Sequence, residues 1–72
     1  METTSTILVF KTDINTEARR ELVGEFFKSK GIAWNVDLQD IDCVLRIETS
    51  RFSAEELIAM VNELGYFCQE LD

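Results

Sequence analysis

Two segments with the periodicity of amphipathic helices, each lying between strand-like segments, limit most strongly how this chain can fold. Apolar residues recur every three or four positions between Glu17 and Lys30 and again between Ser53 and Leu64, the spacing of a buried helix face. Apolar or alternating runs, typical of strands, cover residues 7–10, 32–38, 43–48 and 66–71. The order strand, helix, strand, strand, helix, strand predicts an α+β fold.

A βαββαβ order in so short a chain predicts a ferredoxin-like sandwich. Each helix has to cross the sheet right-handedly, which gives a four-stranded antiparallel sheet of order 4-1-3-2 with both helices on one face. The chain has 72 residues, too few for two separate cores, so residues 1–72 are expected to form a single domain. Residues 1–5 are polar apart from Met1 and are expected to be disordered.

Local signals indicate where each helix begins and which face it buries. Asn15 or Thr16 is placed to cap the first helix, and Ser53 with Glu56 forms a capping box for the second. Gly24 lies inside the first helix, where close packing would explain it. The apolar stripe expected on that helix consists of Ala18, Leu22, Val23, Phe26 and Phe27.

Charge and composition narrow the class of protein. The net charge is −7, with 14 acidic and 7 basic residues, which disfavours binding to the phosphate backbone of nucleic acids. No apolar run approaches the roughly 20 residues that cross a bilayer, and no leader precedes the first strand. Two cysteines without any histidine fit a reduced thiol pair. We therefore expect a cytoplasmic protein that binds no nucleic acid and does not insert into a membrane.

Four segments carry a family resemblance: Val36–Leu38, Val44–Ile47, Ser53–Leu57 and Glu63–Cys68. Together they resemble the heavy-metal-associated domain, a superfamily that includes small copper chaperones and the N-terminal domains of metal-pumping ATPases. In that family, a Met-x-Cys-x-x-Cys loop before the first helix binds a soft metal ion through two thiolates. Here Ile14, Thr16 and Arg19 stand at those positions, and none of them is a soft ligand. The resemblance thus implies a degenerate member without a metal or cofactor in this loop.

The remaining ligand candidates leave one alternative open. Alternation places Cys43 and Cys68 on the helix-facing side, two strand spacings of about 4.8 Å apart, which is too far for a direct disulfide. We interpret them as small buried apolar residues, the alternative being a divergent metal-handling protein that uses them or oxygen ligands. The candidate oxygen ligands are Asp13, Asn15, Glu17, Gln39, Asp40 and Asp42.

No residue pattern predicts catalysis, because the chain has no histidine and shows neither a nucleophile with an adjacent base nor a phosphate-binding glycine loop. Alternation instead directs several apolar side chains to the sheet face away from the helices. This predicted partner surface consists of Ile7, Val9, Val44, Phe67 and Leu71. Such a patch is typical of a binding surface, although Lys11, Arg46 and Gln69 are long enough to cover part of it. The sequence therefore favours a non-enzymatic interaction module that binds either a second copy of itself, as a homodimer, or a protein partner. A ligand-sensing regulatory domain is a third hypothesis, based on fold analogy alone.

Overall fold

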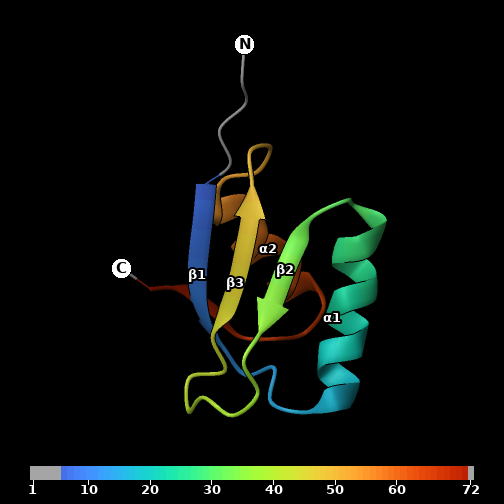
Figure 1. Cartoon of the computed structure of the whole chain (residues 1–72), viewed down its shortest axis with the longest axis vertical. Coiled ribbons are helices and arrows are strands. Elements are labelled where there is room, and N and C mark those ends of the chain that lie inside the picture. The colour runs from blue at the N-terminus through green and yellow to red at the C-terminus, as the bar shows by residue number, and fades with distance from the viewer. Residues whose placement is uncertain (1–5, 72) are drawn as a thin grey trace.

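The computed structural model describes residues 6–71, which form one antiparallel sheet and two helices (Figure 1). In chain order the elements are β1 (Thr6–Thr12), α1 (Glu17–Ser29), β2 (Ala33–Val36), β3 (Leu45–Thr49), α2 (Ala54–Glu63) and β4 (Cys68–Glu70). The strand order β2-β3-β1-β4 is the predicted order read from the other edge, so the α+β class and the strand order are confirmed. The expectation of disorder concerns residues 1–5, which lie outside the described residues.

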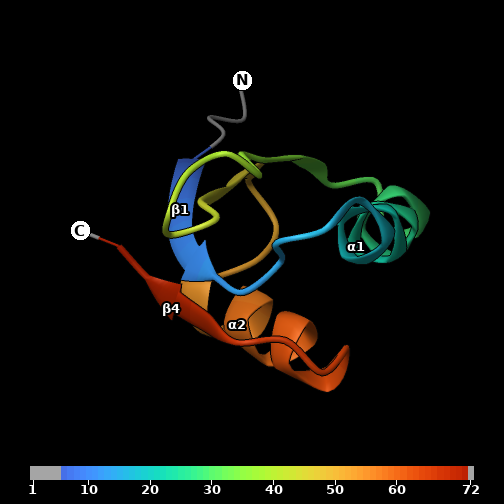
Figure 2. The same cartoon turned by 90° about the horizontal axis from the view of Figure 1, so that it is seen from below.

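One sheet face and both helices enclose a single hydrophobic core. In the antiparallel register Phe10 lies opposite Leu45, and Val36 lies opposite Leu45 from the other side, so all three side chains point to the same face. Seen from below, α1 and α2 lie on the same side of β1 (Figure 2). The buried apolar cluster consists of Phe10, Ile14, Val23, Phe27, Ile32, Val36, Leu45, Ile47, Leu57, Val61 and Cys68.

Both helices begin where the sequence predicts. Thr16 caps α1, its Oγ1 accepting the Arg19 N–H at 3.2 Å. Ser53 and Glu56 form the reciprocal capping box of α2, with donor–acceptor distances of 2.8 Å and 3.2 Å. These side chains satisfy backbone N–H groups that have no partner within the helix, and they fix the point at which each helix leaves its loop.

The buried face of α1 differs from the predicted stripe. Val23 and Phe27 are buried as expected, but Leu22 is 49% exposed and Ala18 is exposed as well, so the prediction is wrong for these two. Gly24 takes a buried position instead, because the ring of Trp34 on β2 lies directly against it; a Cβ added at Gly24 would overlap that ring. Because glycine has no side chain, this face of α1 can pack closely against Trp34 of β2.

Three strands are shorter than their sequence patterns. β2 ends before Asp37, whose carboxylate accepts the Gln39 N–H at 3.0 Å and begins the turn. β3 begins at Leu45 rather than at Cys43, because Cys43 adopts a φ of 44° and donates its N–H to the Asp40 carbonyl. β4 covers Cys68–Glu70 only. Tight turns at the strand ends therefore replace the outermost predicted pairings.

Candidate functional site

The face of the sheet away from the helices, called the open face here, carries the predicted partner surface. Ile7 and Val9 alternate on β1 with Leu8 and Phe10, which lie on the core side. The Leu71 N–H donates to the Val9 carbonyl at 2.8 Å, so Leu71 lies beside Val9. Ile7 is 59% exposed, whereas Val9 and Leu71 are half-buried. The structure thus brings these three apolar side chains together.

Polar side chains separate Phe67 from this cluster, and Val44 lies just outside β3. Lys11 lies opposite Gln69 in the register, and both stand between Val9 and Phe67, which is 48% exposed. The Phe67 N–H donates to the carboxylate of Asp13 at 2.9 Å, at the far end of β1. Val44 precedes β3 and pairs through its carbonyl with the Asp37 N–H. The open face therefore carries one apolar cluster, Ile7, Val9 and Leu71, with Phe67 beyond the polar pair Lys11 and Gln69 and with Val44 just before β3.

The loop that corresponds to the family's metal site is occupied by structural contacts. Ile14 is fully buried and donates its N–H to Thr12 Oγ1, and Thr16 is the helix cap. Arg19 donates from Nη1 to the Asp13 carbonyl at 2.9 Å, and its guanidinium lies 5.7 Å from the centroid of the Tyr66 ring. The charged guanidinium of Arg19 therefore connects this loop to Tyr66, which follows α2.

The two cysteines lie on either side of Thr12. Thr12 Oγ1 donates to the Cys43 carbonyl at 2.7 Å, and Thr12 is the register partner of Cys68 across β1 and β4. Both cysteines are free and buried, and burial raises the pKa of the Cys68 thiol to about 11. Within residues 6–71 no group of three or more histidine, cysteine or acidic side chains is arranged to hold a metal ion.

Three of the candidate oxygen ligands, Asp13, Asp40 and Asp42, contact the backbone or a lysine, and Glu17 pairs with Arg20. Besides the Asp13 contact, the Asp40 carboxylate accepts the Asp42 N–H at 2.8 Å. The Asp42 carboxylate lies 3.6 Å from Lys11 Nζ. These carboxylates therefore order the turns in which they lie, which is a common role of aspartate in turns.

Titration of Cys68 is expected to make stability fall at high pH. An unfolded thiol with the ordinary pKa of 9.0 loses its proton before the folded one, whose pKa is about 11. The stability that this thiol contributes is therefore complete below pH 9 and is lost as the pH rises through 11, by up to about 3 kcal/mol at about 1.4 kcal/mol per pKa unit. Urea unfolding at several pH values, compared with Cys68→Ala, isolates this contribution from those of lysine and tyrosine. Equal pH dependence in the two proteins would contradict it.

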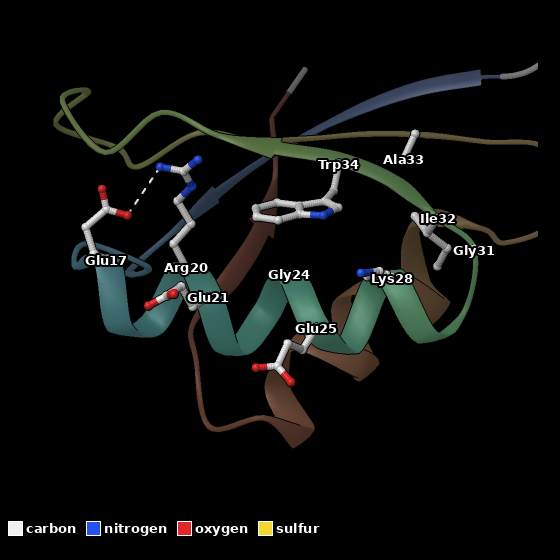
Figure 3. Close-up of a pocket in the computed structure, with 10 residues that line it drawn as sticks. All are labelled: Glu17, Arg20, Glu21, Gly24, Glu25, Lys28, Gly31, Ile32, Ala33 and Trp34. Carbon is white, nitrogen blue, oxygen red and sulfur yellow. Dashed lines mark hydrogen bonds and ion pairs between the residues drawn. The ribbon is translucent and has the colours of Figure 1, made fainter.

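A groove between α1 and β2 is the feature that sequence reasoning missed. It has a volume of about 930 Å³, and Gly24 and Trp34 contribute to its lining (Figure 3). Charged side chains of α1 line it as well: Glu17, Arg20, Glu21, Glu25 and Lys28. A glycine inside a helix and a lone tryptophan were both visible in the sequence, but no local pattern joins one to the other.

Comparisons with known proteins do not add a relative. No family model matches this chain, and neither a curated protein nor a solved structure matches it. Among residues 6–71, no helix has the length and apolar character needed to cross a bilayer. The functional conclusion therefore rests on the geometry of the chain itself.

Proposed function

We propose that this chain is a non-enzymatic interaction module that self-associates through the open face of its sheet. The observation that carries the proposal is the uncovered apolar cluster of Ile7, Val9 and Leu71, with Ile7 exposed by 59%. Apolar surface in contact with water is unfavourable, and a partner that covers it recovers that free energy. Phe67, exposed by 48% at the far end of β4, extends the same face.

A second copy of the chain is the partner that this face fits best. A two-fold interface places one surface against itself, so its charged groups must complement their own copies. The open face carries both signs, because Arg46 lies opposite Val9 and Glu48 lies opposite Ile7 in the register. In a two-fold dimer Arg46 of one copy can meet Glu48 of the other. A domain of this size also gains stability from association.

The proposal includes the finer points of fold and family. We take the fold to be a ferredoxin-like sandwich, supported by the βαββαβ order and the single core shared by both helices. We regard the chain as a metal-free relative of the heavy-metal-associated domain, in keeping with the structural roles of Ile14, Thr16 and Arg19. The unbridged cysteines support a cytoplasmic location.

Analytical ultracentrifugation of Ile7→Lys tests the dimer. We expect the wild-type protein to dimerise and this variant to dimerise at least about tenfold more weakly, because a charged lysine would replace an apolar contact in the interface. The matched control is Leu22→Lys, since Leu22 is 49% exposed on α1 and lies outside the open face. We expect no change in its dimer affinity.

Two outcomes would contradict the proposal. One is a wild-type protein that stays monomeric at about 1 mM, a concentration at which even weak dimers form. The other is an equal loss of affinity in both variants. Native mass spectrometry of the reduced protein with copper(I) adds a separate check: a monomer that binds one copper ion would favour metal handling through Cys43 and Cys68 instead.

A further inference from the structure

β2 is an edge strand whose outer backbone groups face the groove beside α1. It pairs only with β3, and the Asp37 N–H donates to Val44 directly opposite. Because hydrogen-bonded residues alternate in an antiparallel pair, the N–H and C=O groups of Trp34 and Val36 point away from β3. The Ile32 N–H, which points the same way, donates to the Phe27 carbonyl of α1. Within residues 6–71, no hydrogen bond uses the outward groups of Trp34 and Val36.

The groove beside this edge has an aromatic floor. The Trp34 ring lies flat along α1 at Gly24, between Arg20 and Lys28 (Figure 3). One side of the ring stays open to solvent, since Trp34 is only half-buried. Unpaired backbone groups on a sheet edge are what domains use to bind an extended peptide as an added strand, and the partly exposed Trp34 ring lies next to them.

Charge at the rim of the groove indicates what kind of peptide fits. Arg20 forms an ion pair with Glu17 at 3.3 Å, whereas Glu21 and Glu25 have no salt-bridge partner among residues 6–71. The two free carboxylates are four residues apart on α1, which separates them by about 6 Å along the helix. Alternate residues of a strand are about 6.8 Å apart on one face. Two lysines at alternate positions of an added strand therefore match the two carboxylates.

We infer that this groove binds an extended, basic segment of another polypeptide as a fifth strand beside β2. The backbone of the segment pairs with the outward groups of Trp34, the β2 residue whose unpaired groups lie at the groove. Its lysine stems lie on the Trp34 ring, where a cation–π contact adds to the attraction, and the ammonium groups reach Glu21 and Glu25. The net charge of −7 attracts such a segment from a distance. The groove is separate from the open face, so the inference stands whether or not the protein dimerises there.

A synthetic peptide, acetyl-Lys-Val-Lys-Val-Lys-Val-amide, is the probe for this inference. Trp34 is the only tryptophan, so its fluorescence reports directly on the groove. We expect a saturable blue shift of its emission as the peptide covers the ring. Glu21→Lys should weaken binding by about fivefold, because an attraction becomes a repulsion. Glu63→Lys, the same change at an exposed position of α2, should leave binding nearly unchanged.

A second peptide is N-methylated at the residues whose N–H groups would pair with β2. It distinguishes strand addition from simple charge attraction. It keeps every charge but loses backbone donors, and we expect it to bind at least about tenfold more weakly. Equal binding of both peptides, or equal effects of Glu21→Lys and Glu63→Lys, would overturn the inference in favour of nonspecific attraction. Absence of any change in Trp34 emission at saturating peptide would overturn it as well.

Discussion

Replacing Phe10 with alanine is expected to lower the free energy of unfolding by about 3–5 kcal/mol. Phe10 is fully buried on β1, a central strand, and lies opposite Leu45 of β3. Removal of its ring leaves a cavity that the surrounding sheet cannot close. A domain of 72 residues has a total stability of about 4–11 kcal/mol, so the variant should lose between about a quarter and all of it. Urea unfolding followed by circular dichroism measures the loss.

Phe67→Ala is the matched control, because Phe67 is the same residue type and lies immediately before β4 but is 48% exposed. We expect it to cost less than about 1 kcal/mol. Should Phe10→Ala prove too unstable to purify, Phe10→Leu provides a milder measurement, with an expected cost of less than about 1.5 kcal/mol. Equal losses from the two alanine variants would mean that Phe10 is not at the centre of the core.

The division of β1 between core and open face was predictable from the sequence. Successive side chains of a strand point to opposite faces, so a run that is apolar on both faces must either be covered twice or leave one face open. The rule places Ile7 and Phe10 on opposite faces, and the structure shows that the face of Phe10 is the core side. Helix starts were equally predictable, because the capping residues Thr16 and Ser53 act within a few positions of themselves.

The groove was not predictable, because it depends on how α1 is rotated against β2. The apolar spacing of α1 allowed a stripe that includes Leu22, and this stripe satisfies a helix considered alone. In the structure Trp34 packs against Gly24 and Leu22 is left exposed. The choice between these two faces is made by contact with another element, and intrinsic helix periodicity carries no information about it.

The extent of the open face was only partly predictable for a related reason. Alternation assigns each apolar residue to a face, but the strand register decides which of them are neighbours. Gln69 lies opposite Lys11, and this pair separates Phe67 from Val9. Leu71 lies beside Val9 because of the hydrogen bond between their backbones. If the strands were paired in a different register, the same apolar residues would lie on this face but would have different neighbours, so a different cluster would form.

Replacing Thr12 with valine is expected to lower the free energy of unfolding by about 2–3 kcal/mol. Thr12 is 5% exposed; its Oγ1 donates to the Cys43 carbonyl at 2.7 Å and accepts the Ile14 N–H at 3.2 Å. Valine has nearly the same shape, so packing is preserved while two buried backbone groups lose their partner. Each such loss costs about 1–3 kcal/mol, less the cost of burying the hydroxyl itself. Urea unfolding of the variant measures the sum.

Thr12→Ser and Thr49→Val distinguish the hydroxyl from the rest of the side chain. Thr12→Ser keeps both hydrogen bonds and loses one methyl group, which costs about 1 kcal/mol. Thr49 is 6% exposed, and from the described residues its Oγ1 accepts only the Arg51 N–H, so Thr49→Val should cost about 1 kcal/mol. A Thr12→Val protein as stable as the wild type would contradict this role for the hydroxyl. If the prediction holds, amide exchange at Ile14 should also accelerate in Thr12→Val, because one buried hydroxyl joins the loop before α1 to the turn before β3.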